Sequence, residues 1–199
     1  NYTFIHKGLA FVIANNSGTA TPELSASAIA EREAKLRAHL ASHESRPVIV
    51  ACHVPVIPMR DDTAIQASFD IPTYKVAEPG MLQIIEQHRD HVAAVLSGHV
   101  HLSATVRHND ITHIDVCGTA GYPHDVALHT VTREALYTEF IPLPDELLDP
   151  STNIHGKPWH DQDFTDTAHP DHASYLRGLT SERAIRTPLK MPLRDSTPA

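Results

Sequence analysis

The sequence predicts an α/β fold, and three features of its patterning support this. Two apolar runs without polar alternation, at residues 48–52 and 92–96, are typical of strands covered on both faces. Segments with apolar residues at helical spacing lie before and between these runs. After His101 the patterns up to residue 141 are strand-like. This order favours a layer of parallel strands with helices, followed by successive antiparallel strands.

Each element follows from a local pattern. Two short runs of β-branched and aromatic residues separated by Lys7-Gly8 predict adjacent strands or a hairpin. Pro79 favours the start of the second helix. The weakly periodic stretch after His53 predicts a long loop, a kind of loop that is usually functional. The predicted elements are strands at 2–5, 9–14, 48–52 and 92–96, helices at 25–43 and 79–89, a loop at 53–77, and strands at 104–107, 111–117, 126–131 and 136–141.

Composition limits the classes of function. The net charge of -8 argues against binding to a nucleic-acid backbone, which needs a basic surface. No run reaches the roughly 18 apolar residues that suggest a membrane span. The two cysteines, Cys52 and Cys117, lie in apolar runs, so we expect small buried side chains rather than a disulfide. Compartment and oligomeric state do not follow from the sequence.

The chain divides into a body at residues 1–141 and an extension at residues 142–199. Eight of the 15 prolines fall in the extension and no apolar period holds there, so we expect it to be mostly irregular, with one short helix at 174–179. An arm that packs over the domain, anchored by Trp159 and Tyr175, is favoured over a metal-binding or lid segment, because no known ligand spacing is present. The histidines of the extension are His155, His160, His169 and His172.

Two histidine motifs follow the two buried strands. His53 comes directly after the first strand, and Gly98-His99-Val100-His101 follows the second. In open α/β sheets this edge is where ligands bind. In an extended stretch, residues two apart point to the same side, so His99 and His101 could reach one binuclear site. Gly98 is expected to let the backbone pass close to the metal ions. A single histidine here would more often be a capping or surface residue.

Together these motifs resemble the signature of the calcineurin-like metallophosphoesterases over roughly residues 1–141. That family has a Gly-His-x-Pro-like motif and then Gly-His-x-His, matched here by residues 52–55 and 98–101. The resemblance implies an αββα sandwich of two mixed sheets. It also implies that His53 and His99 bind one metal ion and that His101 binds the other.

The sequence departs from the family pattern in two places. Cys52 stands where the family has a glycine, and the acidic and Gly-Asn-His motifs that precede these in the family have no match. We therefore expect the chain to be the C-terminal half of such a domain, with the missing ligands and some strands before Asn1. Expressed alone, such a fragment is expected to expose an apolar sheet edge and to aggregate.

The resemblance implies a metal-dependent phosphoester hydrolase. Two ions, drawn from Mn, Fe, Zn or Co, would generate a hydroxide that attacks a small phosphorylated substrate, namely a phosphomonoester, phosphodiester or pyrophosphate. His124 is a possible substrate contact. Arg60, Asp61 and Asp62 could line the pocket, although a solvated charged loop is the favoured interpretation for each. Zinc amidohydrolases also use His-x-His, but they place it before further strand–helix units. A non-catalytic binding or scaffolding protein of the same fold is the second alternative.

Overall fold

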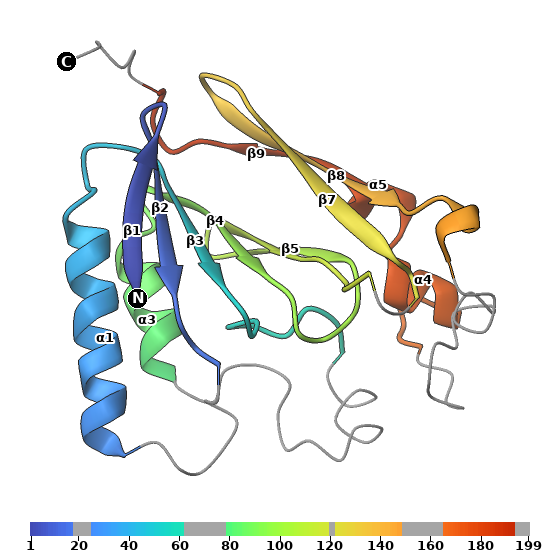
Figure 1. Ribbon diagram of the computed structural model, residues 1–199, viewed down its shortest axis with the longest axis horizontal. Coiled ribbons are helices and arrows are strands. Elements are labelled where there is room, and N and C mark those ends of the chain that lie inside the picture. The colour runs from blue at the N-terminus through green and yellow to red at the C-terminus, as the bar shows by residue number, and fades with distance from the viewer. Residues whose placement is uncertain (18–24, 62–78, 120–121, 149–164, 194–199) are drawn as a thin grey trace.

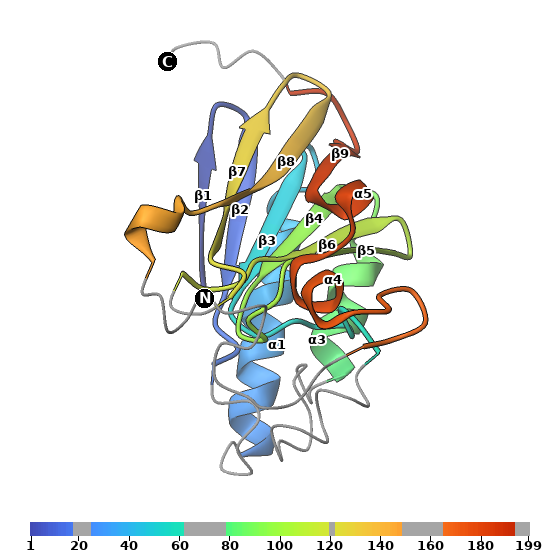
Figure 2. The same cartoon turned by 90° about the vertical axis from the view of Figure 1, so that its right-hand side faces the viewer.

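The structure is a computed structural model that describes residues 1–17, 25–61, 79–119, 122–148 and 165–193. Figures 1 and 2 show two sheets stacked face to face, with helices on the outer side of the larger one. In chain order the elements are β1 (Tyr2–His6), β2 (Leu9–Ala14), α1 (Ala26–Ala41), β3 (Val48–Cys52), α3 (Pro79–Gln87), β4 (Val92–Ser97), β5 (Ala104–His108), β6 (Ile111–Asp115), β7 (Asp125–Val131), β8 (Ala135–Pro142), the 3-10 helix η1 (Asp145–Leu147), α4 (His172–Arg177), α5 (Thr180–Arg183) and β9 (Ala184–Pro188).

The larger sheet has six strands in the order β1-β2-β3-β4-β6-β5. Strands β2, β3, β4 and β6 run parallel to one another, while β1 and β5 are antiparallel to their neighbours at the two edges. The predicted hairpin and the predicted parallel layer are therefore confirmed. One expectation is corrected: β6 pairs antiparallel with β5 but parallel with β4. The β5–β6 hairpin returns the chain to the sheet, so β6 extends the parallel layer.

Helices α1 and α3 cover one face of the larger sheet. Ser25 caps the start of α1, since its hydroxyl accepts a hydrogen bond from the backbone N–H of Ala28 at 3.2 Å. Leu36 and Leu40 pack in one apolar cluster with side chains of α3 and of the strands beneath. Each such buried side chain contributes about 1.5–3 kcal/mol through removal from water. This packing fixes the helices that the sequence pattern predicted.

The second sheet has three strands in the order β7-β8-β9 and covers the opposite face. Leu136 and Phe140 of β8 meet Ile49 and Ile114 of the larger sheet in a second apolar cluster. The expected sandwich of two mixed sheets is corrected on this point, because the smaller sheet is antiparallel throughout its described strands. Strand β8 lies in the middle of this sheet, with β7 on one edge and β9 on the other.

The described part of the extension packs onto the rest of the chain. The expected helix at 174–179 is present as α4, shifted toward the N-terminus. Tyr175 is fully buried, so its predicted role as an anchor is confirmed, whereas Trp159 lies outside the described residues. Strand β9 was not expected, because the sequence of this segment has no strand pattern. It joins the smaller sheet by pairing with β8. The division of the chain at residue 141 stays a prediction.

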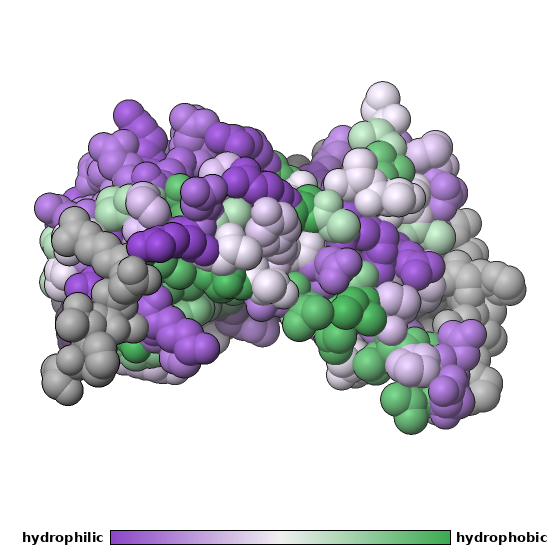
Figure 3. Space-filling model, turned by 90° about the horizontal axis from the view of Figure 1, so that it is seen from above, coloured by the Kyte–Doolittle hydropathy of each residue, from purple (hydrophilic) through white to green (hydrophobic). Residues whose placement is uncertain are grey.

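Two further features concern the surface and the thiols. A groove of about 510 Å³ lies between the sheets and is lined by apolar side chains that include Leu9, Phe11 and Leu136. Seen from above, the molecule narrows at a waist, and apolar side chains gather beside it (Figure 3).

Cys52 and Cys117 are free thiols. In the ranges that the structure describes, no helix is long and apolar enough to cross a membrane.

Candidate functional site

The C-terminal ends of the parallel strands meet at one edge of the larger sheet. Ala14 at the end of β2 is opposite Cys52 at the end of β3, and Ser97 at the end of β4 is opposite Asp115 at the end of β6. His53 follows β3 directly, and the Gly98–His101 segment follows β4. The two motifs therefore lie at the same edge, as the sequence predicted.

His53 and His99 are brought into contact there. The Nδ1 atom of His99 lies 3.1 Å from the Nε2 atom of His53, and the ring centroids are 4.9 Å apart at an angle of 70°. Burial lowers the pKa of His99, and the neighbouring His53 and His101 rings lower it further. Burial and His53 likewise lower the pKa of His101. The lowered pKa values of His99 and His101 favour the neutral form of imidazole, which is the form that binds metal.

The backbone of the His-x-His segment is not extended. His99 has φ 77° and His101 has φ 54°, and the N–H of Val100 donates to the carbonyl of Gly98 at 2.9 Å. The expected geometry, in which extended backbone points both side chains the same way, is wrong. Left-handed backbone at non-glycine residues costs roughly 1–3 kcal/mol and persists where surrounding structure enforces it, often at functional sites.

The role expected of Gly98, to let the backbone pass close to metal ions, stays a prediction, and the protein's own described atoms do not require a glycine there. A Cβ atom placed there would meet only the carbonyl oxygen of Val116, at 3.5 Å, which is an ordinary contact. Its φ also lies outside the left-handed range. The described residues therefore leave room for alanine at this position.

Asn16 holds the start of the loop that carries His53. Its side-chain oxygen accepts hydrogen bonds from the N–H groups of His53 and Val54, both at 3.0 Å, and its amide donates to the carbonyl of Val54 at 2.7 Å. The carbonyl of His53 in turn accepts from the N–H of Gly98 at 3.0 Å, which joins the two histidine loops. Sequence reasoning assigned Asn16 only to a turn, because a long-range clamp leaves no local pattern.

A buried polar layer lies beneath the histidines. Asp115 is fully buried, and its Oδ1 accepts a hydrogen bond from the Ser97 hydroxyl at 2.8 Å. Burial raises the pKa of this carboxyl well above its usual range, against the opposing effects of Ser97 and Arg60. Burial, together with Asp115, raises the pKa of the Cys52 thiol to about 12, so this thiol is not a reactive thiolate. Sequence reasoning missed Ser97 and Asp115, because both stand at the ends of apolar strands.

The other predicted site residues lie in different surroundings. His124 is only 2% exposed, and its Nδ1 lies 3.0 Å from the carbonyl oxygen of Thr119, so its contact with substrate stays a prediction. Arg60 is buried rather than solvated, and it binds Glu182 of the extension. Asp61 accepts a hydrogen bond from Tyr175 through its carbonyl. Asp62, His155 and His160 lie outside the described residues.

His169 and His172 of the extension are both buried. His169 lies between two carboxylates, 2.8 Å from Asp166 and 3.0 Å from Glu182. These contacts belong to an arm that packs on the domain, which was the favoured interpretation. Whether the rest of the extension has another role stays a prediction.

The histidine pair fits part of a metal site. With metal–nitrogen distances of about 2.0–2.1 Å and tetrahedral geometry, two ligand nitrogens lie roughly 3.3–3.4 Å apart. The 3.1 Å between His53 and His99 is close to that separation. Within the described part of the chain, no group of three or more histidine, cysteine or carboxylate side chains is placed to hold an ion. The pair therefore fits two ligands of one ion, and the described residues add no third ligand to it.

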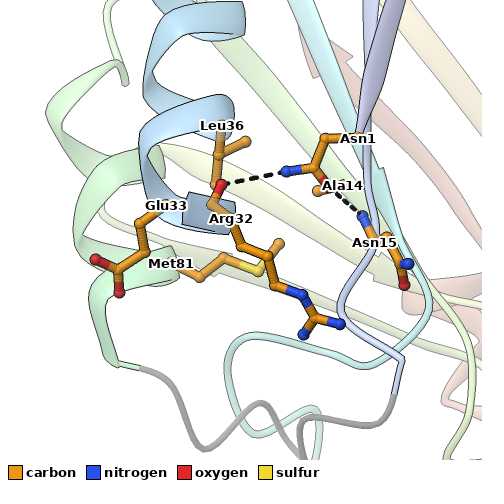
Figure 4. Close-up of a pocket in the computed structure, with 7 residues that line it drawn as sticks. All are labelled: Asn1, Ala14, Asn15, Arg32, Glu33, Leu36 and Met81. Carbon is orange, nitrogen blue, oxygen red and sulfur yellow. Dashed lines mark hydrogen bonds between the residues drawn. The ribbon is translucent and has the colours of Figure 1, made fainter. Parts of the chain in front are cut away.

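A small cavity lies at the end of β2, beside the clamp of Asn16. Asn1 links its two walls: it donates to the carbonyl of Arg32 at 3.2 Å and accepts from the N–H of Asn15 at 2.7 Å (Figure 4). The cavity measures about 10 Å³, room for about one water molecule. It cannot hold a substrate.

Comparisons with known proteins address the fold. No family model matches the sequence, and no curated protein matches it. One similar solved structure is GAP50, described as the anchor in the inner membrane complex of Plasmodium, with 13% identity and a TM-score of 0.52 over 71% of this chain. Another is a dimetal phosphatase from Danio rerio, with 18% identity and a TM-score of 0.43 over 60% of this chain.

The chain spans less than half of either structure, 48% of GAP50 and 36% of the phosphatase. At such low identity the likeness to GAP50 concerns the fold alone. The chain thus has a mixed α/β architecture with a second, antiparallel sheet, and its fold is similar to that of GAP50 over 71% of the chain.

Proposed function

We propose that this chain belongs to a metal-dependent phosphoester hydrolase in which His53, His99 and His101 are metal ligands. The observation that carries the proposal is the approach of His99 to His53 across two separate loops, with ring nitrogens 3.1 Å apart. Two imidazoles that meet at the C-terminal edge of a parallel sheet occupy the usual place for a ligand in such folds. The motif spacing that resembles the metallophosphoesterases supports the same assignment.

The protein residues have separate tasks in this proposal. A bound metal pair would supply Lewis acidity and a hydroxide near neutral pH. His53 is exposed and His99 half-buried, so the pair is accessible to a small phosphorylated substrate. The hydrogen bond from Asn16 to His53 and the backbone hydrogen bond between Gly98 and His53 hold the two histidine loops in place. Further ligands, carboxylates among them, are required beyond these three histidines, because imidazoles alone provide no bridge between two ions.

The test measures metal content and hydrolysis of bis-p-nitrophenyl phosphate on the full-length protein that contains this chain. Variants His53→Ala and His99→Ala are compared with His6→Ala, which removes an exposed imidazole from strand β1. We expect the parent to carry about two metal equivalents and to turn over substrate. Both site variants should lose metal and activity, while His6→Ala retains both. A parent without metal that hydrolyses nothing would contradict the proposal.

A non-catalytic binding or scaffolding role is the second candidate. The specific observation in its favour is that the described residues offer a pair of ligands and no larger metal-binding group. In this case His53 and His99 form a hydrogen-bonded pair that joins two loops. Replacing both with glutamine would then change stability, without any change in metal content or in activity toward phosphoesters.

A further inference from the structure

Two adjacent charged residues of the C-terminal extension bind buried residues of the body, one of which lies in the loop that follows His53. Glu182 and Arg183 end the short helix α5, and each forms an ion pair with a buried residue of the body. Glu182 binds Arg60, seven positions after His53, and Arg183 binds Asp125, directly after His124. A segment more than 100 residues away in sequence from His53 thus contacts the loops of the site.

Arg60 is held on several sides. Its guanidinium lies 2.8 Å and 3.3 Å from the two carboxylate oxygens of Glu182, and it also donates to the carbonyls of Tyr175 at 3.0 Å and Ser103 at 3.1 Å. His169, 3.0 Å from Glu182, contacts the same carboxylate. A buried guanidinium without a partner carries a large free-energy cost. The ion pair therefore holds the loop after His53 in a fixed position relative to Glu182.

Arg183 forms the matching contact on the other side. Its two terminal nitrogens donate to both oxygens of Asp125, at 2.8 Å and 2.9 Å, and it also donates to the carbonyls of Arg177 and Phe140. Asp125 is only 1% exposed. Such two-pronged arginine–carboxylate pairs fix orientation as well as distance.

Ser103 joins the two ion pairs. It is fully buried two positions after His101, its carbonyl accepts from Arg60 at 3.1 Å, and its hydroxyl donates to Asp125 at 2.7 Å. Its N–H donates to the carbonyl of Leu176 in the extension at 2.7 Å. Gly178 lets this close approach happen: its φ is 79°, and a Cβ atom there would lie 3.0 Å from the Ser103 carbonyl oxygen.

We propose that Glu182 and Arg183 are positioning residues that set the relative placement of the His53 and His101 loops, through Arg60, Asp125 and their shared contact Ser103. The consequence for catalysis rests on the proposed function, but the coupling between extension and histidines does not. The ion pairs act at a distance from the imidazoles. Removing either should therefore displace His53 and His101 without removing a ligand.

The experiment uses the full-length protein labelled with ¹⁵N at histidine, so that the imidazole signals of His53 and His101 are observed by NMR without added metal. The variants are Glu182→Gln and Arg183→Gln. The matched control is Arg186→Gln, which alters an exposed arginine on β9 of the same extension. Thermal unfolding is recorded for each, and spectra are taken well below the midpoint, where a loss of stability alone does not move the signals.

We expect both variants to shift the His53 and His101 signals and the control to leave them in place. In Co²⁺ titrations the variants should bind about 10- to 100-fold more weakly, as with other changes in supporting contacts of metal ligands. Unmoved imidazole signals in folded variants would overturn the proposal. If Arg183→Gln fails to fold, Arg183→Lys decides in the same way, because it keeps the charge and loses the two-pronged contact. A parent that binds no Co²⁺ would refute the proposed function only, since the NMR comparison still decides the coupling.

Discussion

His113 offers a quantitative test of the packing on the helix-covered face. It lies in the middle of β6, is 2% exposed, and its Nε2 has no hydrogen-bond partner among the described residues. Burial, with a smaller effect from His108, lowers the pKa of His113 from 6.5 to about 3. The folded protein therefore holds this imidazole neutral, while the unfolded chain accepts a proton near the ordinary value. The perturbation is a decrease of pH on the parent and on His113→Leu.

The sign and size of the change in the free energy of unfolding with pH follow from proton linkage. Between pH 6.5 and 3 the unfolded chain binds more protons at His113 than the folded protein does, so stability rises with pH in this window. At pH 5 the preferential protonation of the unfolded chain lowers the free energy of unfolding by roughly 2 kcal/mol relative to pH 7.5. Down to pH 3, where the folded protein begins to accept the proton as well, the loss reaches roughly 4 kcal/mol, at about 1.4 kcal/mol for each pH unit.

Urea denaturation at pH 7.5, 6 and 5, followed by circular dichroism, measures these free energies. His113→Leu should lose about 2 kcal/mol less than the parent between pH 7.5 and 5, because it has no proton to accept at this position. It should also be at least as stable as the parent at pH 7.5, since leucine leaves no unpaired nitrogen in the core. The control His6→Leu removes a solvent-exposed imidazole and should keep the parental pH dependence. Equal losses in parent and His113→Leu would refute the buried neutral state of His113.

Three further changes test separate features. Asn16→Ala removes three hydrogen bonds of the His53 loop and should lower the free energy of unfolding by about 3 kcal/mol in urea titrations, because it leaves buried backbone groups unpaired; a loss below about 1 kcal/mol would contradict the clamp. Gly98→Ala should change the free energy of unfolding by less than about 1 kcal/mol. Gly178→Ala should lower it by about 1–3 kcal/mol, because the φ of Gly178 is 79°. A larger loss for Gly98→Ala than for Gly178→Ala in thermal unfolding would refute this difference between the two glycines. Phe4→Lys should reduce aggregation of the chain expressed alone, measured by light scattering, because Phe4 is 46% exposed on the edge strand β1; unchanged scattering would exclude that edge as the cause.

Local patterns in the sequence predicted the larger sheet and its helices well. The unbroken apolar runs became β3 and β4, buried on both faces, and the amphipathic segments became α1 and α3. These elements were predictable because the spacing of apolar residues shows which faces of a helix or strand are buried. That spacing does not depend on which other element buries them. The same reasoning placed His53 and the His-x-His segment at one sheet edge, since parallel strands end together.

Long-range partners were not predictable in the same way. The parallel pairing of β6 with β4 and the addition of β9 to β8 depend on which edges are free once the chain has folded. Arg60 looked like part of a solvated loop, because its partner Glu182 lies 122 positions further along. The left-handed backbone at His99 and His101 was likewise not predicted, because no local pattern in the sequence marks it.

The sequence by itself therefore determined the α/β class, the order of most elements and the edge at which the histidines gather. Only the tertiary structure decided the distance between His53 and His99, the clamp of Asn16 and the ion pairs that link the extension to the site. The physical reason is that periodicity is a local property, which one segment carries in full. A hydrogen bond or ion pair between distant residues forms only when the folded chain brings both partners together. The sequence around one partner does not indicate which residue the other will be.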